Sequence, residues 1–391
     1  MNNNKQRLAN RFLYKLALGV YGNGFAKRHL TIDRSGLQDT KPPYIVLSTH
    51  ASNADVFGTA VALTPQVLNF VASIDQLVGF HFIKERLGLI PKRQFTVDLS
   101  LVRLIKSVTD KGRGVAIFPE GKLSVDGRNS VLAVNLGKLA KVLRLPIVTA
   151  HFDGSYLYKP RWAINARPSV KAKATIETTV TQWEADNLSA EALSAKLIQR
   201  LTYDDNLYQL QEHIEIKENN RAEGLHTILY KCPVCQAEFC NDTKDDKLYC
   251  SMCGAIHELQ PDGRLRSITG DNTMYSSVPE WTDFERLSVR KEIMDGSYLM
   301  EYDCVVTSIP TDKHYVELGS GRLVSDVDGI NLSIAGEVIH FPPKAFYTIP
   351  FNTKYVFLST ESNTYKVDLG AYNGETAKLN FAVEQLYKSF Q

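Results

Sequence analysis

Long uninterrupted hydrophobic runs are missing from this sequence of 391 residues. The longest candidate, 56–83, is broken by one proline and several polar side chains: Pro65, Gln66, Asn69, Asp75 and Gln76. No segment therefore reaches the roughly 18–20 apolar residues that a membrane-spanning helix needs. A secretory signal peptide is not expected either, because Lys15 interrupts the apolar stretch near the N-terminus and no small-residue cleavage site follows it. We expect a cytoplasmic protein that is peripherally associated with the inner face of a membrane.

Acidic residues are absent from residues 1–30, although the whole chain is almost balanced at 45 Lys+Arg and 43 Asp+Glu. The basic residues of this segment are Lys5, Arg7, Arg11, Lys15, Lys27 and Arg28. Apolar residues recur every four positions at Leu8, Phe12, Leu16 and Val20, which predicts one apolar face of a helix. A basic amphipathic helix suits the surface of an anionic membrane. The alternative is a surface helix docked on the protein's own core.

Cysteine is scarce, with six in the chain, and four of them form two Cys-x-x-Cys pairs. The pairs, Cys232/Cys235 and Cys250/Cys253, are separated by 14 residues. This spacing resembles a zinc ribbon, in which each tight turn offers two thiolates to a tetrahedral Zn²⁺. A redox motif would need only one pair, and a metal rather than disulfides indicates a reducing compartment. We predict a structural zinc held by these four cysteines, with Cys240 and His257 as substitutes, and a buried thiol at Cys304.

The first half of the chain alternates short apolar runs with helical patterns. Strands are expected at 43–50, 114–121 and 145–152, and helices at 54–63, 99–110 and 130–144. This rhythm predicts an α/β fold with a mostly parallel sheet covered by helices. Reactive groups in such sheets lie beyond the carboxyl ends of the strands. His50 and Glu120 both follow a predicted strand, so we expect them to share a pocket.

The second half of the chain has a different pattern. Residues 186–222 are helical and charged, and 217–224 read as a linker. A helix is expected at 280–294, an antiparallel β domain at 297–369 and a closing amphipathic helix at 376–389. This order of elements resembles a PH-like or GRAM-like module, which would serve for interaction with a protein partner. The predicted regions are a membrane-associating segment at 1–30, a catalytic domain at 31–215, a zinc ribbon at 225–262 and a β-rich accessory domain at 280–391.

His50 and Asp55 lie five positions apart in the stretch STHASNAD. Ser52 and Asn53 are good N-cap residues, so a helix is expected to begin directly after the strand, with Asp55 in its first turn. A carboxylate there can accept a hydrogen bond from one imidazole nitrogen and leave the other nitrogen as a base. The alternative is a polar turn after a buried strand.

This His-Asp pair, followed about 70 residues later by Phe118-Pro119-Glu120-Gly121, resembles the glycerolipid acyltransferases typified by 1-acylglycerol-3-phosphate acyltransferase. Further stretches at 82–91, 145–155 and 159–174 agree, so that the resemblance covers roughly residues 5–205. The resemblance implies a transferase of phospholipid biosynthesis. It would move a fatty acyl group from acyl-CoA or acyl carrier protein to a hydroxyl of a lysophospholipid. His50 would be the general base, Asp55 its partner, and 118–121 would hold the acceptor's polar head.

Two arginines that the family usually carries are missing. Lys122-Leu123-Ser124 follows the Glu-Gly pair, and Leu99 stands where the second arginine is usual, with Arg103 one turn later. Such arginines typically meet a phosphate, and lysine does not reproduce a bidentate guanidinium. Lys122, Arg93 and Arg103, together with Lys92, are the candidates to supply this charge.

Other functions stay open on the sequence alone. An acyltransferase fold that has lost turnover would be a non-catalytic lipid- or partner-binding protein. A hydrolase would use the same base to pass the acyl group to water. No nucleic-acid partner is predicted.

Overall fold

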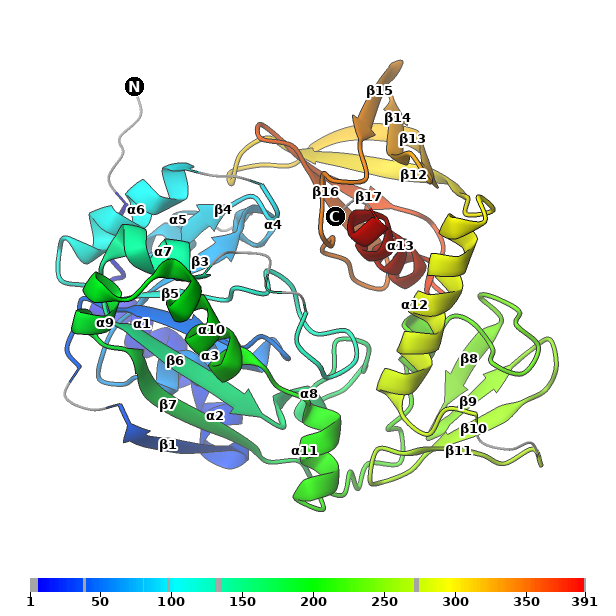
Figure 1. Cartoon of the computed structure of the whole chain (residues 1–391), viewed down its shortest axis with the longest axis horizontal. Coiled ribbons are helices and arrows are strands. Elements are labelled where there is room, and N and C mark those ends of the chain that lie inside the picture. Colours follow the sequence, from blue (N-terminus) through cyan, green and yellow to red (C-terminus); the bar gives the residue numbers. More distant parts are fainter. Residues whose placement is uncertain are drawn as a thin grey trace. The chain divides into compact units, whose positions relative to one another are not determined.

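The computed structural model describes residues 6–37, 40–79, 81–96, 99–130, 132, 136–270 and 274–389. Two compact units make up the chain (Figure 1). Unit 1 comprises Met1–Lys159, Val170–Tyr208 and Thr311–His314, and unit 2 comprises Pro160–Ser169, Gln209–Pro310 and Tyr315–Gln391.

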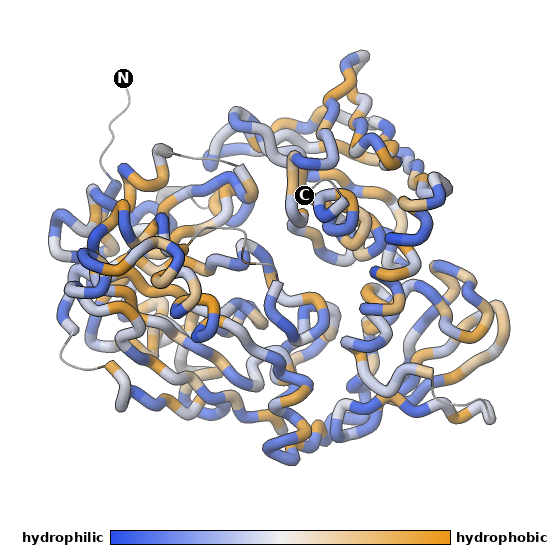
Figure 2. Tube along the Cα trace, in the orientation of Figure 1, coloured by the Kyte–Doolittle hydropathy of each residue, from blue (hydrophilic) through white to orange (hydrophobic). Residues whose placement is uncertain are grey.

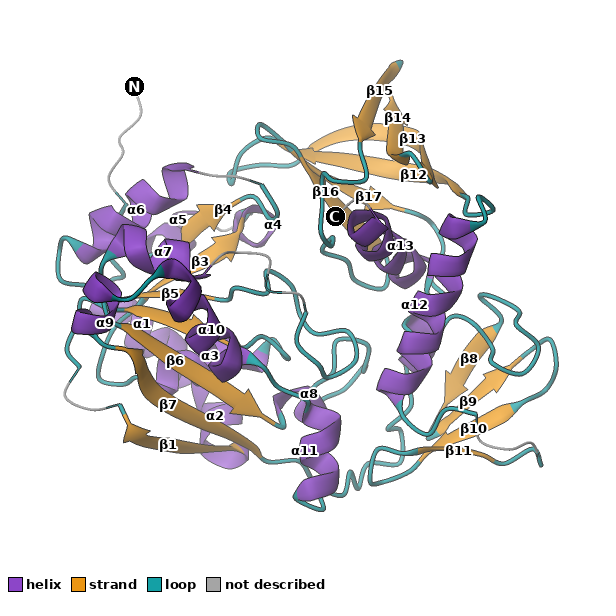
Figure 3. Ribbon diagram, viewed as in Figure 1, coloured by secondary structure: helices purple, strands orange, loops and turns teal. Residues whose placement is uncertain are grey.

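Unit 1 is built on a seven-stranded sheet in the order β1-β7-β6-β2-β5-β3-β4. Its strands are β1 (Leu30–Gly36), β2 (Ile45–Ser48), β3 (Asn69–Ser73), β4 (Ile90–Lys92), β5 (Val115–Ile117), β6 (Ile147–Asp153) and β7 (Ala172–Val180). Strands β6, β2, β5, β3 and β4 are parallel, whereas β7 pairs antiparallel with β6 and parallel with β1. The predicted mostly parallel sheet with helices around it is confirmed (Figure 3).

Both faces of this sheet are covered, so its central strand β2 is buried along its whole length. In β2, Val46 packs into one core cluster with residues of α3 (Ala54–Ala62), while Ile45 and Leu47 pack into another on the opposite face. The second face is covered by α6 (Leu99–Thr109), α7 (Leu136–Leu143), α9 (Gln182–Asn187) and α10 (Ala190–Leu201). Short helices α4 (Ile74–Leu77), α5 (His81–Arg86), α8 (Ser155–Tyr158) and α11 (Asp205–Gln211) complete the connections.

The N-terminal segment is helical but not one continuous helix. It consists of α1 (Arg11–Ala17), a π-helical turn η1 (Leu18–Gly22) and α2 (Asn23–His29), and the side chain of Asn10 caps α1. Phe12, Leu16 and Val20 are 74%, 54% and 64% exposed, respectively. Nowhere in the described part of the chain does a helix combine the length and the apolar character needed to cross a bilayer.

Unit 2 contains two antiparallel sheets. The first has the order β11-β10-β9-β8, from β8 (Asn241–Lys244), β9 (Lys247–Cys250), β10 (Ile256–Leu259) and β11 (Leu265–Ser267). The second has the order β15-β14-β13-β12-β17-β16, from β12 (Met300–Ile309), β13 (Val316–Asp326), β14 (Gly329–Ile334), β15 (Glu337–Phe341), β16 (Tyr355–Ser359) and β17 (Thr364–Asp368). The predicted antiparallel β domain is confirmed.

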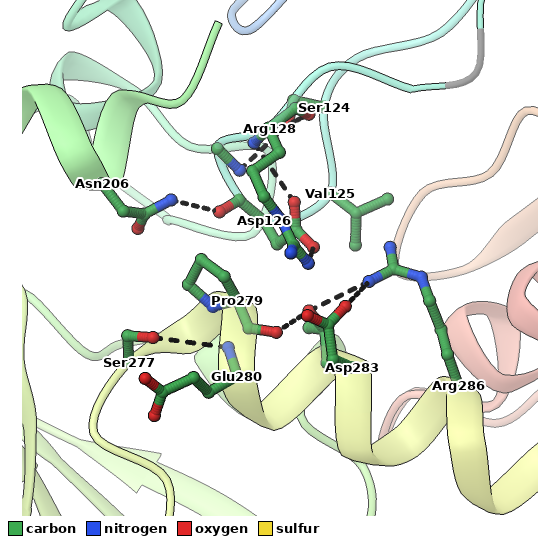
Figure 4. A network of polar contacts seen from close by, with 12 residues as sticks. Ser124, Val125, Asp126, Arg128, Asn206, Ser277, Pro279, Glu280, Asp283 and Arg286 are labelled. Carbon is green, nitrogen blue, oxygen red and sulfur yellow. Dashed lines mark hydrogen bonds and ion pairs between the residues drawn. The ribbon is translucent and has the colours of Figure 1, made fainter.

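The helices of unit 2 are η2 (Leu225–Thr227), α12 (Val278–Met294) and the closing helix α13 (Glu375–Ser389). Hydrophobic and hydrophilic residues alternate along α12 (Figure 2). At its start, the side chain of Ser277 accepts a hydrogen bond from the main-chain N–H of Glu280 (Figure 4). Arg286 lies over the ring of Phe381, 4.3 Å from its centroid, and so joins α12 to α13.

Two lysines and two glutamates connect the cysteine segment to these helices. Lys231 binds Glu238 at 3.1 Å and Glu292 at 3.6 Å. Lys378 of α13 binds the same two carboxylates, at 2.7 and 2.9 Å. Because Glu292 belongs to α12 and Lys231 precedes Cys232, this network ties the cysteine segment to both helices.

The predicted linker at 217–224 is packed rather than loose. Arg221 is buried, pairs with Asp246 at 2.9 Å and donates to the carbonyl of Leu259. Glu218 accepts from the main-chain N–H and the hydroxyl of Ser169, at 2.8 and 2.5 Å. Residues 160–169 are thereby held in unit 2 although β7 of unit 1 begins at Ala172.

Candidate active site and candidate metal centre

The turn between β2 and α3 carries both residues of the predicted dyad. His50 lies between the end of β2 at Ser48 and the start of α3 at Ala54, and Asp55 lies in the first turn of α3. The Oδ2 atom of Asp55 accepts the main-chain N–H of Ser52 at 2.8 Å, which holds the turn closed. The main-chain oxygen of His50 accepts the N–H of Ser124 at 3.1 Å.

Glu120 lies beyond β5, the parallel neighbour of β2, and the structure brings it to His50. The sequence predicts that the two residues lie together, because each follows a predicted strand of a parallel sheet. Its Oε1 accepts the main-chain N–H of His50 at 2.9 Å. Its Oε2 accepts the N–H of Ser130 at 2.8 Å and the hydroxyl of Tyr203 at 3.1 Å. With the residue only 1% exposed, the carboxylate is enclosed by donors.

His50 and Asp55 are not joined by a hydrogen bond. The Nδ1 atom of His50 and the Oδ1 atom of Asp55 are both buried, and neither has a hydrogen-bond partner among the residues that the structure describes. The imidazole ring lies against the ring of Phe118, with 4.4 Å between their centroids. One donor or acceptor position on each side chain is therefore left for the other or for a substrate.

Burial sets the charge state of this cluster. It lowers the pKa of His50 to about 4, so the imidazole is neutral near pH 7 and can accept a proton. Burial also raises the pKa of Asp55 well above its usual value and that of Glu120 to about 7. In the case of Glu120 the donors from Ser130, His50 and Tyr203 oppose this rise.

Four further predicted site residues, Phe118, Pro119, Gly121 and Lys122, belong to the turn that presents Glu120 or follow it directly. The N–H of Gly121 donates to the oxygen of Phe118 at 3.1 Å, and Gly121 has a φ of +69°, which suits glycine. Pro119 and Lys122 are buried. The side chain of Gln94 donates to the oxygen of Gly121.

The two predicted arginines are placed differently from each other. Arg93 is partly buried, and its main-chain oxygen accepts the hydroxyl of Thr96 at 3.0 Å. Arg103 is exposed on α6. Within the described residues, no hydrogen bond or ion pair joins Arg103 to His50 or to the turn at 118–121.

Sequence reasoning missed Tyr203 and Asp205, which follow α10. The carboxylate of Asp205 accepts the main-chain N–H groups of Gly154 and Tyr156, both at 2.8 Å, and burial raises its pKa to about 7. The local sequence signal is a tyrosine followed by two aspartates, at 203–205, shortly after the amphipathic helix α10. Nothing in that pattern indicates contact with Glu120, which lies 83 positions away.

Residues 29–153 match the family model described as Acyltransferase. The chain contains an acyltransferase domain. The predicted resemblance is thereby confirmed, and the domain's matched residues include His50, Asp55 and the turn at 118–121. No curated protein matches the chain.

Among solved structures, the chain is similar to the 1-acyl-sn-glycerophosphate acyltransferase PlsC from Thermotoga maritima. The sequences are 16% identical, and the similarity covers 49% of this chain and 77% of that one, with a TM-score of 0.36.

The four predicted metal ligands form one cluster in unit 2. The sulfur atoms of Cys232, Cys235, Cys250 and Cys253 all lie within 4.8 Å of one another. The Cys232–Cys253 distance is 3.7 Å and the Cys235–Cys250 distance is 3.8 Å. In a tetrahedral site with Zn–S bonds of about 2.3 Å, neighbouring sulfurs lie about 3.8 Å apart. The cluster can therefore hold a metal ion of this size.

Neither substitute ligand is needed. The thiol of Cys240 donates to the oxygen of Glu238 at 3.1 Å. The ring of His257 is buried edge-on against Trp281, with 4.9 Å between centroids.

Proposed function

We propose that this protein transfers a fatty acyl group from an acyl thioester, acyl-CoA or acyl carrier protein, to a hydroxyl of a lysophospholipid such as 1-acylglycerol-3-phosphate. The observation that carries the proposal is His50, which lies in the acyltransferase domain with a buried, unpaired Nδ1. A neutral imidazole in this position is suited to remove a proton from the acceptor.

In the proposed reaction, Nε2 of His50 takes the proton of the acceptor hydroxyl as its oxygen attacks the thioester carbonyl carbon. Among the described residues, the structure contains no hydrogen bond between Asp55 and Nδ1. We propose that the Asp55 side chain turns during the reaction so that its carboxylate accepts a hydrogen bond from Nδ1 and stabilises the imidazolium that forms. The new C–O bond replaces the C–S bond, and the departing thiolate receives the proton from His50. A base of this kind contributes typically 10²–10⁴-fold.

We propose that the turn at 118–121 helps to hold the acceptor's polar head, with positive charge from Lys122, Arg93 and Arg103. Lys122 follows this turn directly and lowers the pKa of Glu120, which places its charge near that carboxylate. The exposed guanidinium of Arg103 is available to an incoming phosphate.

The proposed site at the membrane surface rests on the N-terminal segment. Phe12, Leu16 and Val20 are exposed together, with the exposed cations Arg11 and Lys15 beside them. This combination suits peripheral binding to an anionic leaflet. For the cysteine cluster we propose Zn²⁺ in a structural role, because all four ligand positions are filled by thiolates.

The test is the release of free thiol from acyl-CoA and acyl carrier protein by the purified protein. The assay uses a panel of lysophospholipids as acceptors and one arm without an acceptor. His50→Ala should lower acceptor-dependent release at least 100-fold. The matched control, His151→Gln, alters a histidine of the same domain that contacts Asp153 and the main-chain oxygen of Arg200 instead.

Equal turnover by His50→Ala and wild-type protein would refute the assignment of the base. Release that needs no acceptor would indicate a hydrolase. No release above the His50→Ala background, with either donor and any acceptor, would favour a lipid-binding protein on the same fold.

A further inference from the structure

The Glu120 carboxylate is the link between His50 and a part of the chain that the sequence did not connect to the site. One of its oxygens holds the main chain of His50, and the other is held by Tyr203 and Ser130. We infer that Tyr203 is a positioning residue, which fixes Glu120 and through it the main chain that carries His50. This inference rests on the proposed function, because it assigns Tyr203 a part in that reaction.

The two carboxylate oxygens of Glu120 bind different parts of the chain. Oε1 accepts the N–H of His50 at 2.9 Å, and Oε2 accepts the hydroxyl of Tyr203 at 3.1 Å. Tyr203 is itself buried, so water does not readily replace its hydroxyl. Loss of this hydroxyl leaves the N–H of Ser130 as the one described donor to Oε2 and frees the carboxylate to turn.

The chain around Tyr203 is fixed independently of Glu120. The N–H of Asp205 donates to the oxygen of Gly127 at 2.9 Å, and the carboxylate of Asp205 holds the turn after β6. The side-chain amide of Asn206 donates to the oxygen of Asp126 at 2.7 Å (Figure 4). Tyr203 is therefore a rigid support for Glu120 and not a side chain that follows it.

A structural support would change stability alone, whereas a positioning residue also changes how Glu120 titrates. The titratable groups that act on Glu120 are the carboxyl of Asp55, the ammonium of Lys122 and the hydroxyl of Tyr203. The described hydrogen-bond partners of the Glu120 oxygens are all donors. A proton bound to Glu120 would therefore point toward an N–H or O–H group and weaken that hydrogen bond. Removal of the tyrosine hydroxyl favours this protonation, because that hydrogen bond lowers the pKa of Glu120.

The experiment compares Tyr203→Phe with Tyr156→Phe. Tyr156 is a second buried tyrosine of unit 1, and its hydroxyl donates to the oxygen of Val125 at 3.2 Å. We expect Tyr203→Phe to lower kcat about tenfold with little change in the KM of the acceptor. The acidic limb of the kcat/KM profile should move to higher pH. Tyr156→Phe should show neither effect.

A second measurement does not need turnover. Hydrogen exchange at the main-chain N–H of His50 should be faster in Tyr203→Phe and unchanged in Tyr156→Phe. If wild-type protein transfers no acyl group, the proposed function fails and this exchange decides the contact by itself. Unchanged exchange in Tyr203→Phe would overturn the inference.

A double mutant tests whether Tyr203→Phe lowers activity through Glu120 or through partial unfolding. If Tyr203 acts through Glu120, Tyr203→Phe should have little further effect on kcat in a Glu120→Gln background. Additive losses, or a wild-type kcat and pH profile in Tyr203→Phe, would overturn the inference even where His50→Ala abolishes turnover.

Discussion

Three ionisable residues that follow β2 and β5 are held in environments that disfavour their charged forms and suit proton transfer. Burial favours the neutral forms of His50, Asp55 and Glu120, and Glu120 binds the main chain of His50 beyond two parallel strands. A fold selected for stability alone would avoid several buried ionisable groups without paired charges. Their concentration in the acyltransferase domain is typical of a catalytic site.

Asp55→Asn should separate activity from stability. The folded-state pKa of Asp55 is raised, so its contribution to stability is present below its usual value and is lost as the pH rises. The neutral amide of this variant does not ionise, so it loses no stability as the pH rises. We expect Tm at pH 7 to rise by a few degrees. Acyl transfer should fall 100-fold or more, because the imidazolium loses its carboxylate.

Thermal unfolding at pH 7 and pH 4, together with thiol release, checks both expectations. The gain in Tm should be smaller at pH 4, where the carboxyl of Asp55 is closer to neutral in both folded and unfolded chains. Full activity in Asp55→Asn would remove Asp55 from the proposed dyad.

For single residues, the sequence predicted that His50 and Glu120 lie together, but not which residues hold them in place. His50 and Glu120 could be placed together because parallel strands bring their carboxyl ends to one edge of the sheet. Tyr203 and Asp205 reach the site from the end of α10 through long-range packing, for which no local pattern exists. The missing hydrogen bond between His50 and Asp55 depends on side-chain orientation, which spacing alone does not determine.

Among the secondary-structure elements, too, local sequence patterns predicted some features, whereas tertiary packing determines others. Hydrophobic periodicity identified β2, α3, α6, β6 and α12, because each has one or two apolar faces that must be buried. It did not predict the break between α1 and α2. Gly22, at the end of the π-helical turn, lies so close to α3 that a Cβ there would be 3.0 Å from Val61. Such an approach is a tertiary constraint.

Phe12, Leu16 and Val20 are exposed on the N-terminal segment, and this gives a prediction for membrane binding. Leu16→Asp should weaken binding to vesicles that contain anionic lipid at least about tenfold, since an apolar contact is lost and a negative charge is added. Val142→Asp is the control, because Val142 is 63% exposed on α7 of the same unit. Co-sedimentation at low and high salt would measure the effect.

Equal losses in both variants would show that the N-terminal segment is not the binding surface. Salt-insensitive binding of the wild-type protein would argue against a part for Arg11 and Lys15.

For the whole molecule, the cysteine cluster should control the folding of unit 2 and not the chemistry of unit 1. Lys231 and Glu238 lie beside the cysteines and bind α12 and α13. Metal removal by a chelator should therefore lower Tm by about 10 °C or more and speed hydrogen exchange in 229–259. Thiol release should persist below the new Tm.

Matched cysteine variants sharpen this test. Cys235→Ser removes one predicted ligand, whereas Cys304→Ser removes a buried thiol of β12 outside the cluster. Elemental analysis should find metal bound to Cys304→Ser and strongly reduced in Cys235→Ser. Immediate loss of all turnover on chelation, with both units still folded, would contradict a structural role for the metal.

The attachment of residues 160–169 to unit 2 has a consequence for protease digestion. The polypeptide enters unit 2 at Pro160, returns at Val170 and enters it again at Gln209. A nick near residue 209 would leave unit 2 assembled from both fragments, joined through Ser169 with Glu218 and through Arg167 with the oxygen of Arg221. The two fragments should elute together from a sizing column and separate only in denaturant. A single cut near residue 209 should therefore not release the acyltransferase domain from unit 2.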